Sequence, residues 1–284
     1  MNFSANRLDQ CWCYLAPMKI ETYQVREGKK LSLKDHTTDG TKGVSKEEVK
    51  VRKAQLKLQM VKLQERLYAE EQQSLLVVLQ TRDAGGKDGT IKHVFTGLNP
   101  QGVNVTAFKE PTSLELSHDF LWRVHAHTPA AGMIGVFNRS YYEDVLVTRV
   151  HGEVDKQEIQ RRYDEIRAFE VSLQNRGTRI LKFHLNISKD EQKRRFQDRL
   201  DKPRKEWKFS ENDLSERALW DDYTKAYEDT LSATSTPTAP WYIIPADHKW
   251  FRNDLITQIL LETLNDMNPQ FPEIDFDPTK IVIE

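Results

Sequence analysis

Short, largely apolar runs alternate with amphipathic segments along most of this 284-residue chain. The apolar runs have the length of strands, and runs that are apolar throughout are typical of parallel strands buried on both faces. The segments between them repeat apolar residues at helical spacing. The pattern predicts strands at 75–80, 103–108, 133–137, 179–185 and 241–244, and helices at about 89–97, 113–127, 141–150, 155–176, 189–201, 211–233 and 249–267. We therefore expect an α/β fold, a three-layer α/β/α sandwich around a central parallel sheet.

The ends of the chain have a different character. Ser45 and Glu48 form a capping box ahead of a helix expected to end near Gln73. Residues 18–44 are polar and rich in turn formers, and 269–284 contains three prolines and several acids. The predicted organisation is an N-terminal extension and surface arm over 1–44, one domain over 45–268, and an extended C-terminal arm over 269–284.

Composition narrows the functional classes. The chain is 30% charged and 38% hydrophobic, with a formal net charge of −1. It contains no run of 18 apolar residues, so we expect no transmembrane helix. The two cysteines, Cys11 and Cys13, lie close together, which argues against a disulfide framework and a cysteine-ligated metal. Cytoplasmic residence is expected, without nucleic-acid or membrane partners.

A glycine-rich turn follows the first strand. Residues 81–91 read TRDAGGKDGTI and lead into a helical segment. Glycines let backbone N–H groups approach an anion, and the helix N-terminus and a lysine add positive charge. Compared with the P-loop pattern G-x-x-x-x-G-K-[ST], Thr81 replaces the first glycine, Gly86-Lys87 fits, and Asp88 replaces the hydroxyl. Asp83 would repel phosphate unless a cation lay between them, so we interpret it as a Mg²⁺ anchor, with a solvated turn or helix-cap aspartate as the alternative.

Other charged residues follow the remaining strands. Ligands of an open parallel sheet lie beyond the carboxyl ends of its strands. Arg139, just after the third strand, is positioned to clamp a phosphate bidentately. Glu143 could orient Arg139 or touch a metal, or simply be a first-turn acid favoured by the helix dipole.

The segment 188–208 is strongly basic, with nine Lys or Arg against five Asp or Glu. Arg195 and Arg199 are four residues apart and form a row on one helix face, which suits repeating phosphates. A solvated helix with internal ion pairs is the alternative. Because the segment follows a strand of a phosphate-binding sheet, we interpret residues 188–212 as a lid.

Several blocks together resemble one family. They are Asp83 to Ile91, Asn99 to Gly102, Asp119 to Arg123, Phe137 to Asp144, and Trp207 to Ser210. In this order, over about 18–268, they resemble the polyphosphate kinase 2 family. The Gly-Lys-Asp-Gly loop and the Asn-Arg-Ser block are most similar to the subgroup, often called class III, that phosphorylates nucleoside mono- and diphosphates.

The resemblance implies a P-loop kinase-like fold with a helical lid. It also implies reversible transfer of the terminal phosphoryl group of inorganic polyphosphate to ADP or GDP, giving ATP from ADP, and in this subgroup to AMP. Mg²⁺ is the expected cofactor, with Mn²⁺ as a substitute, and a homo-oligomer (dimer or tetramer) is expected.

The same resemblance assigns site residues. Thr81 stands where the family usually has glycine, and Asn138 where other members carry aspartate, so metal binding rests on Asp83. The asparagine matches the subgroup that uses AMP. The implied catalytic residues are Asp83 (also the metal ligand), Lys87, Arg139 and Arg195. The implied nucleotide- or phosphate-binding residues are Ala84, Gly85, Gly86, Asp88, Gly89, Thr90, Lys92, Asn138, Glu143, Arg194, Arg199 and Lys208.

Two other functions remain open from the sequence. An ATP-dependent nucleoside monophosphate or thymidylate-type kinase would share the loop and the Asn138-Arg139 block, but a basic tract running to Lys208 favours a long-chain donor. A nucleotide-gated regulator without chemistry is the other, and the presence of Asp83, Lys87 and Arg139 together argues against it.

Overall fold

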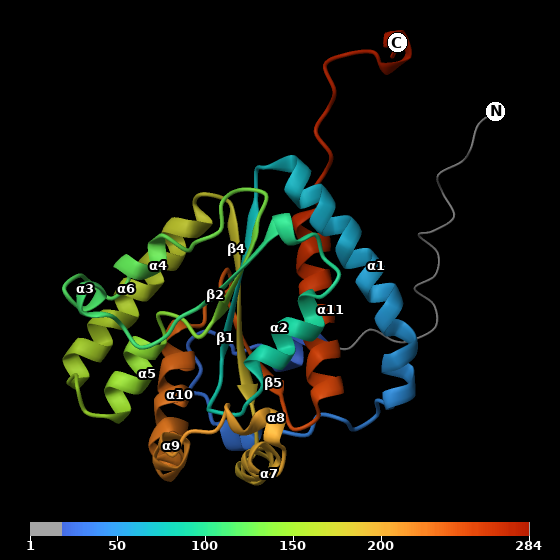
Figure 1. The fold of residues 1–284 in the computed structure, drawn as a ribbon. Coiled ribbons are helices and arrows are strands. Elements are labelled where there is room, and N and C mark those ends of the chain that lie inside the picture. The colour runs from blue at the N-terminus through green and yellow to red at the C-terminus, as the bar shows by residue number, and fades with distance from the viewer. Residues whose placement is uncertain (1–18, 284) are drawn as a thin grey trace.

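A five-stranded parallel sheet forms the centre of the protein (Figure 1). The computed structural model describes residues 19–283, so the extension expected over 1–17 and Glu284 lie outside the described residues. The strand order is β2-β3-β1-β4-β5, and every pairing is parallel. The strands are β1 (Ser74–Gln80), β2 (Val103–Ala107), β3 (Ile134–Asn138), β4 (Thr178–Asn186) and β5 (Trp241–Pro245). All five predicted strands are confirmed, with small differences at their ends.

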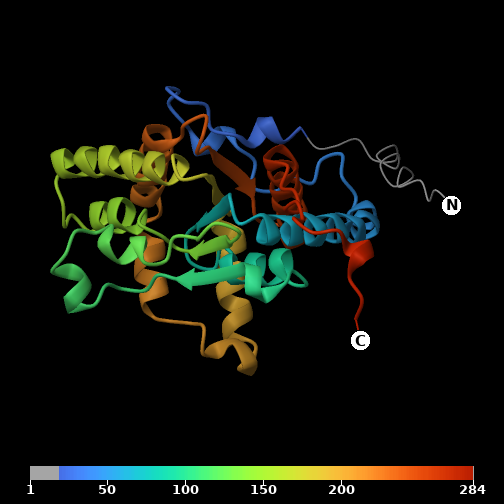
Figure 2. The ribbon, with the colours of Figure 1, turned by 90° about the horizontal axis from the view of Figure 1, so that it is seen from above.

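Helices cover both faces of this sheet (Figure 2). Leu75, Val77 and Leu79 of β1 pack into the layer of α1 (Lys46–Glu70), α2 (Lys87–Phe95) and α11 (Lys249–Met267). Leu76 and Val78 pack into the layer of α5 (Glu143–Val150), α6 (Lys156–Gln174) and α10 (Trp220–Thr234). Successive strand residues point to opposite faces, so a strand buried on both sides must be apolar throughout. The predicted three-layer α/β/α sandwich is confirmed.

The start of α1 is the predicted capping box. The Ser45 hydroxyl accepts from the Glu48 N–H at 3.1 Å, and the Ser45 N–H donates to the Glu48 carboxylate at 2.8 Å. The helix ends at Glu70, earlier than predicted, because Glu71 has a left-handed φ of 52°.

Two predicted helices were wrong in extent. The segment 113–127 contains two short helices, α3 (Ser113–Leu116) and α4 (Trp122–His125). Between them the Ser117 hydroxyl donates to the Leu114 carbonyl, and the Asp119 carboxylate accepts from the Leu121 N–H. Such local side-chain bonds compete with helix continuation. The segment 211–233 is divided into α9 (Asn212–Ala218) and α10 by Leu219, whose ψ is 23°.

The basic segment 188–212 forms two helices at the carboxyl edge of the sheet. They are α7 (Lys189–Leu200) and α8 (Pro203–Glu206). Pro203 occupies the first turn of α8, where its missing N–H costs nothing, and it separates α8 from α7.

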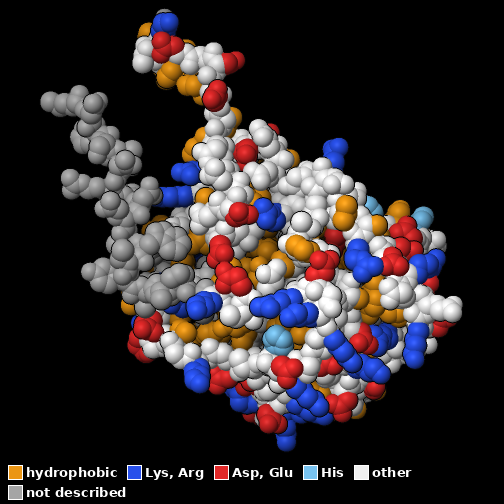
Figure 3. Space-filling model, turned by 180° about the vertical axis from the view of Figure 1, so that it is seen from behind, with side chains coloured by type: hydrophobic (Ala, Val, Ile, Leu, Met, Phe, Trp, Pro, Cys, Tyr) orange, Lys and Arg blue, Asp and Glu red, His pale blue; other side chains and the backbone are white. Residues whose placement is uncertain are grey.

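The two terminal arms differ. Residues 19–44 are more deeply packed than a polar surface arm, because Ile20, Val25, Leu31 and Leu33 are buried against the two layers, with short 3₁₀ turns at Ile20–Tyr23 and Leu33–Asp35. Residues 270–283 are exposed, contain one 3₁₀ turn, Pro278–Lys280, and stand clear of the body (Figure 3). None of the described helices is both long and apolar enough to cross a membrane.

Candidate active site

The glycine-rich loop connects β1 to the N-terminus of α2. Gly86 has a φ of 108°, and a Cβ atom there would lie 2.0 Å from Nη1 of Arg252. A Cβ on Gly85 would lie 2.0 Å from the Thr81 hydroxyl. Both positions therefore require glycine, one for its backbone angle and both for close approach.

Thr81 fits in place of the first P-loop glycine because its side chain turns into the sheet. Its hydroxyl donates to the Leu185 carbonyl of β4 at 2.7 Å. The absent Cβ of Gly85 makes room for it. The cradle thus keeps an open side toward α2 despite the larger residue.

Asp83, Lys87 and Arg139 converge at the carboxyl ends of β1 and β3. Arg139 has a left-handed φ of 63°, and its Nη2 lies 3.3 Å from Oδ1 of Asp83. Burial opposes the charge of Arg139, but Glu143 and Asp83 outweigh it and raise the pKa of the guanidinium. Burial, and then the proximity of Arg139, lower the pKa of Lys87, whose Nζ donates to the Thr81 carbonyl at 3.3 Å. Three residues predicted from the sequence are thus brought together.

Two cavities of different chemistry meet at these residues. One has a volume of about 590 Å³ and is lined by Phe108, Trp220, Tyr223 and Tyr227 together with charged residues of both signs; we call it the aromatic cavity. The other has a volume of about 660 Å³ and is lined by the loop, by lysines and arginines, and by fewer acidic residues; we call it the basic cavity. Both cavities include Asp83, Phe108, Lys109, Glu110 and Arg139 in their linings. A group bound at this junction is accessible from both sides.

The basic segment 188–212 is joined to the loop by a chain of polar contacts. The Asn138 amide donates to Oδ1 of Asp88 at 2.9 Å, and Nζ of Lys208 lies 3.5 Å from Oδ2. Burial opposes the Asp88 charge, but the Asn138 and Lys208 contacts outweigh it and lower the pKa of the carboxyl. Nη1 of Arg199 donates to the Lys208 carbonyl at 2.9 Å and to Asp213 at 3.0 Å. Residues of α2, β3 and the basic segment therefore line one side of the basic cavity together.

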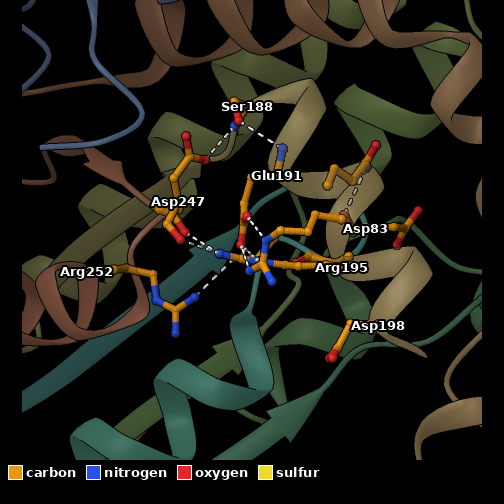
Figure 4. Close-up of polar contacts among 12 residues, drawn as sticks. Asp83, Ser188, Glu191, Arg195, Asp198, Asp247 and Arg252 are labelled. Carbon is orange, nitrogen blue, oxygen red and sulfur yellow. Dashed lines mark hydrogen bonds and ion pairs between the residues drawn. The ribbon is translucent and has the colours of Figure 1, made fainter. Parts of the chain in front are cut away.

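Arg195 and Arg199, which were expected to form a row on one helix face, both line the basic cavity, but the hydrogen bonds of Arg195 are already made within the protein. Its side chain is buried, and its guanidinium donates to the Glu191 carboxylate and to four carbonyls, those of Ala84, Gly85, Ala246 and Asp247 (Figure 4). These five bonds use all five N–H groups of the guanidinium. In this arrangement Arg195 ties the glycine-rich loop to the segment that follows β5, which suits a residue that positions the loop.

The other predicted residues divide between the cavities and the surface. Glu143 lines the aromatic cavity. Ala84, Gly85, Gly86, Asp88, Gly89, Asn138, Arg199 and Lys208 line the basic cavity. Three residues lie outside both linings: Thr90, whose buried hydroxyl donates to the Gly86 carbonyl, Lys92, which is exposed on α2, and Arg194, which is exposed and paired with Glu191. Thr90 thus contacts the loop from inside α2, whereas the side chains of Lys92 and Arg194 are exposed.

Sequence reasoning missed several cavity residues. Lys249 and Arg252 of α11 line the basic cavity, as does Lys205 of α8. The strand-end argument applied to β5 would have found the first two, because they lie in the first turn of the helix that follows it. Trp220, Tyr223 and Tyr227 of α10 line the aromatic cavity, and no local pattern predicts this because it depends on where α10 crosses the sheet.

Comparison with known proteins decides the family. Residues 43–272 match the model of the polyphosphate kinase 2 family. The chain belongs to this family. It is 50% identical over 267 residues to a Meiothermus ruber protein named AMP/ADP-polyphosphate phosphotransferase, covering 93% of this chain and 100% of that one. It is 48% identical over 223 residues to a Rhodopseudomonas palustris protein named ADP-polyphosphate phosphotransferase, covering 74% and 77%.

A solved structure agrees. The crystal structure of polyphosphate kinase 2 from Arthrobacter aurescens TC1 superposes with a TM-score of 0.88 at 46% identity, covering 91% of this chain and 93% of that one. The family resemblance and the P-loop kinase-like fold expected from the sequence are confirmed.

Proposed function

We propose that this polyphosphate kinase transfers the terminal phosphoryl group of inorganic polyphosphate to ADP, GDP and AMP, and that the reaction is reversible. The observation that carries the proposal is the pair of unlike cavities that share Asp83 and Arg139. A group transfer needs a donor and an acceptor that meet at one point, and this junction provides the point.

The basic cavity suits the donor. Lys205, Lys208, Lys249 and Arg199 line it together with the loop that leads into Lys87. Several cations along one cavity match a chain with one negative charge or more at each phosphate. The aromatic cavity suits the acceptor, because Phe108 and Tyr223 line it with flat apolar rings that could contact a nucleobase.

The residues at the junction would act by alignment and by charge. Phosphoryl transfer asks a protein mainly to position the reactants and to stabilise negative charge on the transferred group. The loop N–H groups and Lys87 would hold the phosphoryl group from the side of α2. Arg139, which stays charged beside Glu143 and Asp83, would bind it from β3. The contacts between Lys208 and Asp88 would help to exclude water.

Asp83 fits a role in holding Mg²⁺. Among residues 19–283 no three His, Cys, Asp or Glu side chains are grouped as a metal site, while the partly exposed Asp83 carboxylate lies at the junction. Mg²⁺ is often bound by one or two carboxylates together with substrate phosphates, so a single protein ligand is sufficient. When bound, Mg²⁺ would neutralise phosphate charge. Mn²⁺ is proposed as its substitute.

Use of both AMP and ADP is supported by the relative names and by one residue. The relative with 50% identity is named for AMP and ADP, whereas that with 48% identity is named for ADP. The residue is Asn138, which is neutral where other members of the family carry aspartate and matches the subgroup that uses AMP. Its amide donates to Asp88. Cytoplasmic residence and a homo-oligomeric state stay predictions.

The test is nucleotide formation by the purified protein with Mg²⁺ and polyphosphate, offered ADP in one reaction and AMP in another. The proposal expects ATP from ADP and ADP from AMP, both lost in Lys87→Ala. No transfer from polyphosphate, with ADP formed instead from ATP and a nucleoside monophosphate, would overturn it in favour of an ordinary nucleotide kinase.

A further inference from the structure

Arg252 is a buried arginine with incomplete hydrogen bonding. Its side chain belongs to the first turn of α11 and the residue is 1% exposed. Nη1 donates to the Gly85 carbonyl at 3.2 Å, while Nε and Nη2 donate to the Asn253 amide oxygen at 3.1 and 2.9 Å. These bonds use three of the five N–H groups of the guanidinium. Within residues 19–283 the other two have no protein acceptor.

The charge of Arg252 is also uncompensated within the described part of the chain. No described carboxylate forms an ion pair with it, and the charged group that most affects it is another cation, Arg195. Burial, followed by Arg195, lowers the pKa of Arg252 to about 9. Arg195 itself is neutralised by Glu191, whose Oε1 lies 2.7 Å away. A buried charge without a partner is unfavourable, so this site has a reason to attract an anion.

The position of Arg252 indicates which anion. Figure 4 shows its side chain reaching from α11 toward Arg195 and the loop. A Cβ on Gly86 would lie 2.0 Å from Nη1 of Arg252, and a Cβ on Gly89 would lie 3.5 Å from Nη2. The guanidinium therefore lies against the N-terminus of α2, where backbone N–H groups and the helix dipole also favour negative charge. Arg252, Lys87 and Lys249 all line the basic cavity.

We propose that Arg252 is a phosphate-binding residue whose missing counter-charge is a phosphate group of the polyphosphate donor. The proposal rests on the proposed function and adds a residue from α11 to it. Arg252 binds the donor from behind the loop, while Arg195 positions the loop through backbone carbonyls. The rival explanation is an arginine that serves only the fold by holding the Gly85 carbonyl.

The two explanations predict opposite effects of removing the charge. Arg252→Gln removes the positive charge and keeps a side-chain N–H for the Gly85 carbonyl. If the charge serves a ligand, the ligand-free variant melts at or above the wild-type temperature, because an uncompensated buried charge has gone. If the arginine serves the fold, the variant melts lower and binds phosphate normally. Arg52→Gln is the matched control, because Arg52 contacts the same helix through an ion pair with Asp254 and lines neither cavity.

The experiment measures calorimetric binding of inorganic tripolyphosphate, and separately of ADP, to the wild type, Arg252→Gln, Arg252→Lys and Arg52→Gln. We expect Arg252→Gln to raise the Kd for tripolyphosphate about tenfold or more, the scale of a hydrogen bond to a charged group. Its Kd for ADP stays within about twofold. Arg252→Lys retains charge and falls between wild type and Gln, and Arg52→Gln lowers the melting temperature without changing either Kd.

Each other outcome is decisive. An unchanged Kd for tripolyphosphate with a lowered melting temperature would overturn the proposal, as would a loss confined to ADP. If Arg252→Gln does not fold, Arg252→Met is measured instead, and failure of both neutral variants to fold would also overturn it. A wild type that neither binds tripolyphosphate nor uses polyphosphate would contradict the proposed function itself. A wild type that binds tripolyphosphate only as tightly as Arg252→Gln does would contradict the role of Arg252 alone, so the two failures can be told apart.

Discussion

Arg139 lies where both cavities open, and its backbone adopts a left-handed φ of 63° that a non-glycine residue rarely takes. Its N–H donates to the Leu79 carbonyl at 3.2 Å, and the next side chain, Ser140, is buried beside the Gln80 amide at 3.0 Å. These contacts hold the strained turn. This backbone turn directs the guanidinium toward Asp83, whereas a regular continuation of the strand would not.

The first prediction concerns the two cations at this junction. Arg139→Ala and Lys87→Ala should each lower kcat by about 10³-fold or more, since an arginine finger in related phosphoryl transfer is worth about 10³–10⁵. Both variants should remain folded, because both side chains end in a cavity lining and not in the core. Steady-state kinetics and circular dichroism measure the two effects. Arg161→Ala is the control; its side chain is exposed on α6 and lies outside both cavity linings, so the change should leave kcat unchanged, and a comparable loss there would contradict the assignment.

The second prediction concerns Asp144 in the lining of the aromatic cavity. Burial raises the pKa of its carboxyl to about 6, despite Arg123 nearby. Because the folded pKa exceeds the unfolded value of about 3.9, the folded state binds more protons between pH 4 and 6. This carboxyl therefore contributes less to stability as the pH rises through that window. Asp144→Asn should raise the melting temperature, relative to wild type, more at pH 7.5 than at pH 4.5.

The size of that difference is limited to about 3 kcal/mol, since one pKa unit corresponds to about 1.36 kcal/mol. Thermal denaturation of both proteins at the two pH values measures it. Equal shifts at both pH values would show that the carboxyl titrates normally.

At the scale of elements, the sequence predicted the parts that local pattern determines. Apolar runs predicted all five strands, and Ser45 with Glu48 predicted the start of α1. The strand-end rule brought Asp83, Lys87 and Arg139 to one edge. Contacts between distant segments could not be predicted from local sequence patterns. No such pattern indicates that Arg195 turns inward to four carbonyls, or that Arg252 reaches from α11 to Gly85.

A buried polar network joins distant segments in a way that the sequence does not predict, and it is the basis of the third prediction. Lys182 of β4 donates to Glu170 of α6 at 2.7 Å, and the Tyr141 and Tyr142 hydroxyls donate to the same carboxylate at 2.8 and 2.7 Å. All four residues are buried. Glu170→Gln or Lys182→Met alone should cost about 3–5 kcal/mol, because each leaves a buried charge unpaired.

The double variant of Glu170 and Lys182 should cost clearly less than the sum of the single changes, since it leaves neither charge behind. Urea denaturation of the four proteins completes this double-mutant cycle. Additive costs would show that the two side chains do not act as a pair.

At the scale of the whole molecule, the sheet brings separate binding surfaces to one edge. The basic segment with α7 and α8 follows β4, α11 follows β5, and α10 belongs to the layer opposite α11, yet all three line the two cavities. If donor and acceptor occupy different cavities, their affinities should respond to different substitutions. This separation is a property of the fold and not of any one motif.

The last prediction tests that separation with two variants. Lys208→Ala, in the basic cavity, should raise KM for polyphosphate several-fold and leave KM for ADP nearly unchanged. Tyr223→Ala, in the aromatic cavity, should do the reverse, with KM for ADP raised about tenfold if the ring stacks on a base at the usual ~1–3 kcal/mol. Initial rates with each substrate varied at saturating concentrations of the other measure both constants. If each variant raised both KM values equally, donor and acceptor would share one site, and the two-cavity arrangement would have to be abandoned.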